Sequence, residues 1–394
     1  MQHEGGLLSE RKIVIVNQAV NYLTIGLCNE FAARFADVSL VTGSIHVQGE
    51  ELSAAVKVRS IDRWREEHGI GKALAFMKVL LVIYALLLTR YRRHEVFFVS
   101  VPPMAYLLAI FLPHRCSTII WDVYPDVFKI TGMRETHPLY RVWSRLNCIA
   151  FRRMFRLYTI GERMADLLER YVSRDRIIIQ PIWSIFQRND KVPTESNPFV
   201  VQHGLQGKFV VQYSGNIGLT HKVEVMVALA DRLREHPDIL FQIIGRGPRV
   251  AALRRTVEEK ALANCQFLPF QSDEIFPYSL SAADLGVVIL DELTSKGSVP
   301  SKSYNLMAYG IPSLYIASPD SQLQEYADRY GHAACFTENA LDRAAAFIVA
   351  LKGNPTRYRE MSANSLAAAG HYRRSNATRF VDYYLHPEHH VAQR

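Results

Sequence analysis

Short apolar runs alternate with longer, helix-like stretches along the first half of the chain. Such an alternation predicts a parallel, doubly wound sheet with helices on both faces, which is an α/β architecture. A helix is expected at Leu23–Phe35. The expected strands are Ile13–Val16, Val38–Thr42, Val96–Ser100, Thr118–Trp121 and Leu157–Ile160.

The same alternation resumes in the second half, after a polar, proline-bearing stretch at 189–198. It predicts strands at Phe209–Tyr213, Ile239–Ile244, Gln266–Leu268 and Gly286–Leu290, and helices at Val223–Glu235, Arg249–Ala261 and Ser279–Ala283. We therefore predict an N-terminal domain (1–182), a linker (183–207) and a C-terminal domain (208–370). A final helix at 371–386 is expected to dock back onto the N-terminal domain, and ligands to bind at the carboxyl ends of the strands.

Two apolar stretches in the N-terminal half stand close to arginines. Ala73–Leu88 is interrupted only by Lys78, and Val101–Leu112 is the second stretch. Both are shorter than the roughly 18–20 apolar residues that a membrane span needs. They are either buried helices of a large core or a hydrophobic face that enters a membrane surface, with Arg90, Arg92 and Arg93 at the headgroups. The segment 141–156 mixes arginines with aromatic residues, which favours peripheral membrane binding.

Composition and charge narrow the class of protein. The 394 residues are 49% hydrophobic and 21% charged, as in a globular protein with a large core. Residues 1–200 hold 26 Lys and Arg against 19 Asp and Glu, and residues 201–394 hold 20 against 19. The basic half indicates an anionic partner, although no nucleic-acid-binding module is recognisable. Five scattered cysteines predict neither a disulfide framework nor a zinc site, and the N-terminus lacks a signal-peptide pattern.

Three turns that follow strands in the second half could hold a phosphate. They are Tyr213–Gly218, Ile244–Pro248 and the segment around Pro300–Pro312. Pro300 and Ser301 indicate a helix start, at which Ser301 can cap free amides and the helix dipole favours an anion. The carboxyl ends of parallel strands share one edge, so the three turns can converge. The alternative for each is an ordinary loop with a surface lysine.

Asp122 and Asp126 follow an expected strand in the first half, where α/β proteins place reacting groups. The alternative is that each caps a turn. The chain contains no H-E-x-x-H, G-x-S-x-G or G-x-x-x-x-G-K-[ST] motif and no early G-x-G-x-x-G, and we expect no metal site.

Taken together, these segments resemble the GT-B glycosyltransferases of family 4, the retaining sugar-nucleotide transferases of bacterial surface polysaccharides. The resemblance covers nearly the whole chain. It rests on Tyr213–Gly218, Gly245–Pro248, Phe267–Phe270, Ala282–Gly286, Pro300–Tyr304 and Ala308–Pro312. In addition, Asp122-Val-Tyr-Pro-Asp126 is similar to a segment of the subgroup that acts on lipid-linked O-antigen, capsule and exopolysaccharide intermediates.

The resemblance implies two Rossmann-like domains that face a central cleft. It implies transfer, with retention, of a hexosyl or N-acetylhexosaminyl group from a nucleotide sugar to a polyprenyl-pyrophosphate-linked saccharide. A UDP-sugar is favoured over a GDP-sugar, no metal cofactor is expected, and the protein would lie in the cytoplasm on the inner face of the membrane. The expected catalytic residues are Asp122, Asp126 and Lys302. The expected donor-binding residues are Gly215, Asn216, Gly218, Lys222, Arg246, Phe270, Pro300, Ser301, Lys302 and Asn305.

The chain departs from the family pattern at important positions. The usual Glu-x7-Glu pair is replaced by Gly297 and Asn305, of which Asn305 can still bond a hydroxyl group. Asp291, Glu292 or Lys296 could substitute for the first glutamate. The family's diphosphate-binding Arg and Lys fall at Asn216 and His221. These replacements leave two alternatives open: a non-catalytic lipid- or partner-binding subunit, and a sugar-nucleotide epimerase.

Overall fold

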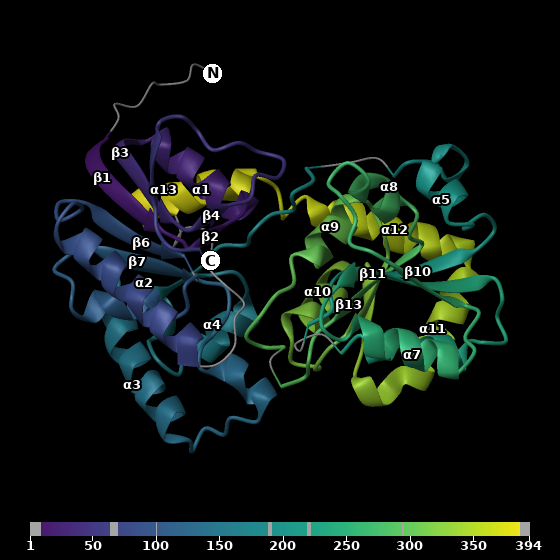
Figure 1. The fold of residues 1–394 in the computed structure, drawn as a ribbon. Helices are drawn as coiled ribbons and strands as arrows, with labels where there is room; N and C mark the ends of the chain where they lie inside the picture. Colours follow the sequence, from purple (N-terminus) through teal and green to yellow (C-terminus); the bar gives the residue numbers. More distant parts are fainter. Residues whose placement is uncertain are drawn as a thin grey trace. The chain divides into compact units, whose positions relative to one another are not determined.

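The computed structural model describes residues 9–63, 70–99, 101–187, 191–218, 222–293 and 295–386. It divides the chain into two compact units, each built around its own sheet (Figure 1). The first unit contains residues 1–128, 132–185 and 374–394, and the second contains 129–131 and 186–373. The chain thus returns to the first unit at Arg374.

The first unit is built on a seven-stranded sheet in the order β5-β3-β1-β6-β7-β8-β9, with every neighbouring pair parallel. Its strands are β1 (Ser9–Val16), β3 (Phe35–Thr42), β5 (Val56–Ser60), β6 (Glu95–Val99), β7 (Cys116–Ile120), β8 (Arg156–Thr159) and β9 (Ile177–Ile179). A separate short pair joins β2 (Ala19–Val20) to β4 (Ser44–Ile45). The predicted parallel α/β architecture is confirmed.

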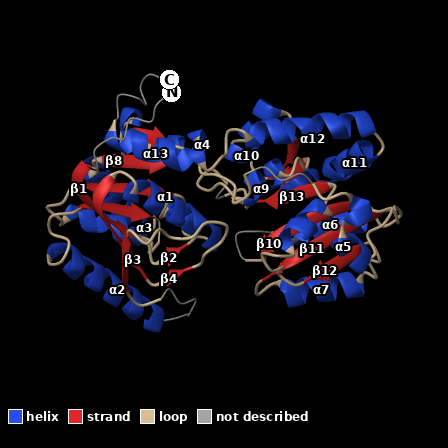
Figure 2. Cartoon of the chain, turned by 90° about the horizontal axis from the view of Figure 1, so that it is seen from above, coloured by secondary structure: helices blue, strands red, loops and turns tan. Residues whose placement is uncertain are grey.

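Helices cover both faces of this sheet. The helices α1 and α13 lie on one face and α2 and α3 on the other (Figures 1 and 2). Aromatic packing holds α13 against the sheet, because the ring of Phe380 stacks on the ring of Tyr158 of β8 with the two centroids 4.0 Å apart. The helices are α1 (Tyr22–Ala32), α2 (Ile70–Leu88), α3 (Pro138–Arg153), α4 (Glu162–Leu168) and α13 (Ser375–Leu385), with 3-10 turns η1 (Ala105–Ile110), η2 (Asp126–Thr131) and η3 (Arg174–Arg176).

Two expectations for the first unit were wrong in detail. The apolar stretch at 101–112 is not a buried α-helix but the 3-10 turn η1 between bends, and Phe111 at its end is exposed. Proline disfavours a helical backbone in the residue before it, so Pro102 and Pro103 keep the first residues of this stretch out of a helix. The helix expected at Leu23–Phe35 ends at Ala32, since Phe35 already begins β3. Ser100, the expected end of a strand, lies outside the described residues.

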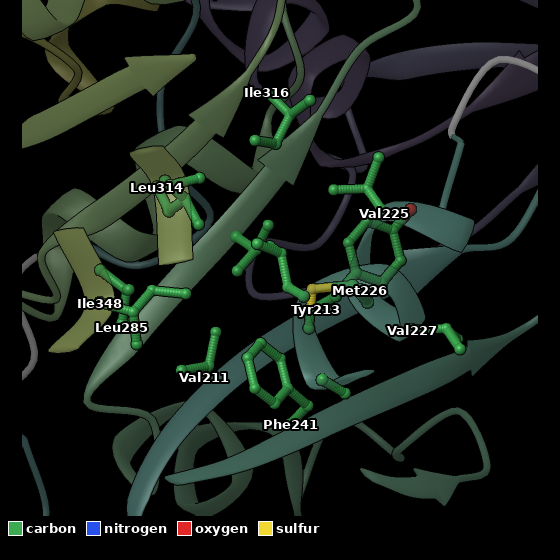
Figure 3. Close-up of a cluster of buried hydrophobic side chains, with 14 of the residues drawn as sticks. Val211, Tyr213, Val225, Met226, Val227, Phe241, Leu285, Leu314, Ile316 and Ile348 are labelled. Carbon is green, nitrogen blue, oxygen red and sulfur yellow. The ribbon is translucent and has the colours of Figure 1, made fainter. Parts of the chain in front are cut away.

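The second unit has a six-stranded parallel sheet in the order β12-β11-β10-β13-β14-β15. Figure 3 shows its core, in which Val211 and Tyr213 of β10 and Phe241 of β11 meet apolar side chains of the surrounding helices. The strands are β10 (Phe209–Asn216), β11 (Ile239–Arg246), β12 (Cys265–Leu268), β13 (Leu285–Ile289), β14 (Ser313–Ile316) and β15 (Ala333–Phe336).

The helices of the second unit are α5 (Pro198–Gln202), α6 (Glu224–Arg232), α7 (Val250–Glu259), α8 (Phe276–Ser281), α9 (Lys302–Ala308), α10 (Gln322–Tyr330), α11 (Leu341–Lys352) and α12 (Pro355–Ala369), with 3-10 turns η4 (Thr194–Ser196) and η5 (Glu338–Ala340). Helix α5 falls inside the expected linker. It packs there because Phe199 and Val200 are buried against Val210 and Ile244, so this helix belongs to the second unit.

Candidate functional site

The two glycine turns of the second unit lie side by side at the carboxyl ends of β10 and β11. The strands remain paired to their last residues, with Gly215 opposite Gly245 and Asn216 opposite Arg246. The backbone N–H of Ile217 then donates to the carbonyl oxygen of Arg246 at 2.9 Å. The convergence expected for these two turns is therefore present.

This close pairing requires glycine. Gly215 has φ of +151° and Gly245 has φ of +157°, which are values that other residues rarely adopt. A Cβ atom at Gly245 would overlap the carbonyl oxygen of Gly215. The glycines thus let two backbones approach closely at the sheet edge, where they leave room for a ligand.

Lys302, the first residue of α9, places its ammonium group beside these turns. Its Nζ lies 4.1 Å from the centroid of the Tyr213 ring, and a Cβ atom at Gly215 would lie 2.9 Å from Nζ. The Lys302 side chain as a whole is half-buried. Its Nζ atom is shielded from solvent and has no hydrogen-bond partner in the described parts of the chain. Loss of hydration lowers the pKa of Lys302 to about 7.

A small pocket surrounds the Lys302 side chain. It is lined by Gln212 and Ser214 of β10, Phe276 and Leu280 of α8, Val287 of β13, and Asn305 and Leu306 of α9. An ammonium group without an acceptor is costly to bury, so this arrangement is suited to an anionic group of a ligand. Asn305 is brought to the same pocket as Lys302, as its position three residues later on α9 allows.

The start of α9 differs from the expectation. Ser301 occupies the N-cap position but makes no capping hydrogen bond, and its side chain is exposed. The hydroxyl of Ser303 instead donates to the carbonyl oxygen of Pro300 at 2.8 Å. The capping role of Ser301 was therefore wrong, because its backbone is already helical and directs the hydroxyl away from the amides.

Lys222 has a different environment from Lys302. Its Nζ lies 2.8 Å from a carboxylate oxygen of Glu338 and 3.1 Å from one of Asp291. The hydrogen bond to Glu338 and the nearby Asp291 raise the pKa of Lys222. Lys222, an expected cation for the diphosphate, is thus already paired with two acids. Asp291 is only 2% exposed, and its burial beside Lys222 was not expected.

Arg246 and Phe270 meet at the ends of β11 and β12. The Arg246 guanidinium carbon lies 5.1 Å from the centroid of the Phe270 ring, and that ring is 54% exposed. Both side chains are thus accessible to a ligand, which fits their expected donor-binding role.

Asn216 is also exposed, and its carbonyl oxygen accepts a hydrogen bond from the Tyr213 hydroxyl at 2.7 Å. Gly218 is the last residue described before a gap that contains His221.

The two expected catalytic aspartates of the first unit have separate roles. Asp126 is 5% exposed, and its carboxylate accepts hydrogen bonds from the hydroxyls of Tyr140 and Tyr171 and from the guanidinium of Arg170, at 2.9 to 3.1 Å. These donors hold the carboxylate inside the unit, and the expected catalytic role of Asp126 stays a prediction. Asp122 is half-buried just after β7 and stays a candidate by its position at the end of a strand.

Glu338 is the site residue that sequence reasoning missed. It follows β15 by two residues, which is the same strand-end signal that identified Asp122. Its neighbour across the sheet edge, Glu292, accepts a hydrogen bond from the Glu338 backbone N–H at 3.0 Å. In the described part of the chain, no cluster of three or more His, Cys, Asp or Glu side chains is arranged to hold a metal ion.

Comparisons with known proteins relate the chain to glycosyltransferases. Residues 197–367, most of the second unit, match the family of glycosyl transferases group 1. The chain is 29% identical over 195 residues to "Putative colanic acid biosynthesis glycosyl transferase WcaI" of Escherichia coli K12, covering 48% of this chain and 47% of that protein. It is 26% identical over 230 residues to "Probable glycosyltransferase WbjE" of Pseudomonas aeruginosa, covering 57% and 56%. The matches thus span about half the length of each curated relative.

Solved structures show the fold of the whole chain. Anabaena HepE in complex with UDP and glucose superimposes with a TM-score of 0.70 at 13% identity, over 95% of this chain and 99% of that one. WaaG, a glycosyltransferase involved in lipopolysaccharide biosynthesis, gives a TM-score of 0.67 at 14% identity, over 94% and 98%. The fold is therefore the two-domain α/β fold with parallel sheets of the GT-B glycosyltransferases, as expected.

Proposed function

We propose that the chain is a retaining glycosyltransferase of bacterial surface polysaccharide synthesis. It transfers a hexosyl or N-acetylhexosaminyl group from a nucleotide diphosphate sugar to a saccharide on polyprenyl pyrophosphate. The observation that carries the proposal is the enclosed ammonium of Lys302, which has no acceptor and lies beside the paired turns at Gly215 and Gly245. The match of residues 197–367 to group 1 glycosyl transferases supports the same activity.

The reaction needs positive charge at the departing diphosphate. Glycosyl transfer passes through an oxocarbenium-like state while negative charge grows on the leaving group. Lys302, the backbone amides of the Gly215–Gly218 turn and the exposed Arg246 can stabilise that charge. We propose that they do so without a metal ion, so transfer should continue in the presence of a chelator.

The acceptor hydroxyl must also lose a proton. Asp126 is engaged by three donors, and we propose that a phosphate oxygen of the donor accepts the proton, on the side of the sugar from which the diphosphate leaves. Attack from that side gives retention of configuration. Asp122 is proposed to orient the acceptor, because it is at the end of β7 and half-buried.

A uracil base is favoured over guanine in the donor. We propose that the base stacks near Phe270, whose exposed ring already lies against the Arg246 guanidinium. HepE, which has the same fold, was solved with UDP and with UDP-glucose. Thermal unfolding with UDP, GDP and ADP tests this, because only a nucleotide that binds the folded protein raises the melting temperature.

A lipid-linked acceptor implies a position on the inner face of the cytoplasmic membrane. No helix in the described ranges is long and apolar enough to cross a bilayer. We propose peripheral attachment through the first unit, whose sequence segments 73–93 and 141–156 combine apolar and basic residues. Each Lys or Arg near an anionic leaflet contributes about 1 kcal/mol, so several together can hold the protein there.

The activity is tested by incubating the protein with labelled sugar nucleotides and a bacterial membrane lipid extract. Lys302→Ala should lose at least about a hundredfold in turnover, as is typical when one charge-stabilising donor is removed. The matched control is Lys208→Ala, just before β10, where the exposed Lys208 ammonium donates to the carbonyl oxygen of Pro237 at 2.7 Å. Full turnover by Lys302→Ala would remove the phosphate assignment.

A second candidate is a binding subunit, or an epimerase, with the same fold. The pairing of Lys222 with Asp291 and Glu338 favours it, because this cation is already neutralised where a diphosphate would need it. A thermal response to none of the three nucleotides would support the binding subunit. Conversion of the free nucleotide sugar without an acceptor would support the epimerase.

A further inference from the structure

Three loops of the first unit are joined at the amino ends of β6, β7 and β8, the edge opposite to Asp122. They are the loops at 89–94, 111–115 and 152–155. The Nε2 atom of His114 lies 3.2 Å from the carbonyl oxygen of Tyr91, and the Arg153 guanidinium donates to the carbonyl oxygen of Ala109 at 3.2 Å. The backbone N–H of Phe155 donates to the carbonyl oxygen of Cys116 at 2.7 Å. We call this joined surface the basic corner.

The basic corner carries exposed arginines without acidic partners. The five are Arg90, Arg92, Arg93, Arg115 and Arg152, and none of them forms an ion pair with a carboxylate of the described residues. The acids Glu95 and Asp37 lie beside the corner and are both paired. Glu95 is held by the Arg11 guanidinium at 2.6 and 2.8 Å and by the Tyr384 hydroxyl at 2.7 Å, and Asp37 lies 2.9 Å from the Lys57 ammonium and 3.8 Å from the His94 ring. The corner therefore presents a concentrated positive charge.

Two guanidinium groups at this corner are held in place by one ring. The guanidinium carbon of Arg115 lies 3.3 Å from the centroid of Phe155, and that of Arg156 lies 3.9 Å from it. The Nε atom of Arg156 is shielded from solvent and has no hydrogen-bond partner within the ranges that the structure describes. The ring holds the exposed Arg115 guanidinium in place, so that it loses little conformational entropy on binding a phosphate group, whereas Arg156 donates one N–H group to the carbonyl oxygen of Phe155 at 3.1 Å.

Exposed apolar side chains accompany the charge. Phe111, in the loop 111–115 of the basic corner, is 67% exposed. Helix α2 is apolar on both faces: Val79, Ile83 and Leu87 are buried, and an outer stripe of Leu74, Met77, Leu81, Val82 and Leu88 is exposed. The members of the stripe recur at helical spacing and form a face that the core does not use, on which the exposed Lys78 pairs with Asp62 at 2.8 Å.

We propose that the basic corner and the outer stripe of α2 form the docking surface for an anionic phospholipid membrane, with Phe111 inserted among the headgroups. This inference rests on the membrane-linked acceptor of the proposed function and names the surface. Arginines without acidic partners match anionic headgroups, and the apolar stripe matches the interfacial layer beneath them. A soluble polyanion would satisfy the arginines but would leave the stripe and Phe111 in water.

The geometry also accounts for access to the acceptor. Helix α2 connects β5 to β6 and so runs antiparallel to the strands, from their carboxyl ends to the basic corner. Its 19 residues span about 28 Å. The first turns of α2 lie at the carboxyl ends of the strands. When α2 lies flat on the membrane, these strand ends, and Asp122 with them, are therefore close to the lipid surface.

The test is sedimentation of the full-length protein with vesicles of phosphatidylcholine alone or mixed with phosphatidylglycerol, at low and high salt. The protein should bind only the mixed vesicles, and binding should weaken at high salt. Arg92→Glu with Arg93→Glu should lower the partition coefficient at least about tenfold, because each reversal removes one attraction and adds one repulsion. Phe111→Ser should lower it severalfold and leave the salt dependence unchanged.

Matched controls separate the docking surface from general effects. Val201→Ser removes an apolar side chain that is 62% exposed on the second unit, and Arg255→Glu reverses an exposed arginine on α7. Neither should alter vesicle binding. Phe111→Trp should show fluorescence quenching by brominated lipids above the wild-type background, which reports insertion directly.

Three results would overturn the proposal that this surface docks on a membrane. They are equal binding of the wild-type protein to neutral and mixed vesicles, and unchanged vesicle binding by the double variant Arg92→Glu, Arg93→Glu. The third is that the double variant loses binding to double-stranded DNA but keeps its vesicle binding. Failure of the proposed function looks different. In that case the protein and its variants would bind mixed vesicles as described, but neither UDP nor a UDP-sugar would raise the melting temperature. A retained nucleotide response in vesicle-binding variants confirms that they are folded.

Discussion

The ammonium nitrogen of Lys302 lies 4.1 Å from the centroid of the Tyr213 ring and has no hydrogen-bond acceptor in the described residues. Tyr213 is on β10 and Lys302 begins α9, so the folded sheet brings together a cation and an aromatic face that are distant in the sequence. The ring attracts the cation but does not neutralise it. This relationship leads to the first two predictions.

The stability of the protein should rise between about pH 7 and pH 10 through Lys302. Enclosure lowers the pKa of Lys302 to about 7 in the folded state, and the unfolded chain has the ordinary, higher value. Between these values the unfolded state binds the proton and the folded state does not, so the free energy of unfolding increases with pH, by about 4 kcal/mol at most. Lys302→Met should lose this increase. Urea unfolding near pH 6 and pH 9.5 measures it, and equal slopes for both proteins would contradict it.

Binding of the nucleotide-sugar donor should be accompanied by uptake of a proton, and the affinity should fall above pH 7. Only the charged form of Lys302 attracts a diphosphate, and the fraction of that form falls about tenfold for each pH unit above its pKa of about 7. Calorimetric titration with UDP-glucose in buffers of different ionisation enthalpy reports the proton uptake. Lys302→Met should bind weakly with no uptake, whereas Lys208→Met should behave as wild type. Affinity independent of pH between 6.5 and 8.5 would argue against Lys302 as the phosphate ligand.

Gly245→Ala should destabilise the second unit by more than about 3 kcal/mol, because the new Cβ would overlap the Gly215 carbonyl and the backbone has φ of +157°. The matched control is Gly204→Ala, where φ is +65° but nothing lies within 4 Å of the added Cβ. That change should cost only about 1 kcal/mol. Denaturant unfolding compares the two, and similar costs would mean that the paired turns can separate without loss.

Asp122 and Asp126 should respond differently to substitution. Asp126→Ala should destabilise the first unit by about 3 kcal/mol, because it removes the acceptor of two buried hydroxyls, while Arg170 keeps Glu135 at 3.1 Å. Asp122→Asn should leave the melting temperature nearly unchanged and reduce transfer to the acceptor. Thermal unfolding and turnover, measured on the same samples, separate the two effects. A stable, inactive Asp126→Ala variant would support a catalytic role for Asp126.

The sequence could predict the local elements whose pattern depends on neighbours in the chain. The strands at Phe209–Asn216 and Ile239–Arg246 were predicted because apolar runs there end in glycine turns, and both were confirmed to within a few residues. The convergence of those turns also followed, since parallel strands share an edge. The apolar stretch at 101–112 was misassigned, because hydrophobicity alone does not distinguish a buried helix from a 3-10 turn that exposes Phe111.

Tertiary structure decided the charge state and the partners of the site residues. Lys222 and Lys302 look equivalent in the sequence, yet Lys222 meets Glu338, 116 residues away, whereas Lys302 lies over the Tyr213 ring and has no hydrogen-bond acceptor among the described residues. Likewise, Asp122 and Asp126 are four residues apart, and only Asp126 is directed into a cluster of tyrosines. Periodicity and turn chemistry act over a few residues, so the sequence by itself determined the parallel α/β frame. Desolvation and ion pairing depend on groups that folding brings together, so only the tertiary structure decided which cation remains available for an anion.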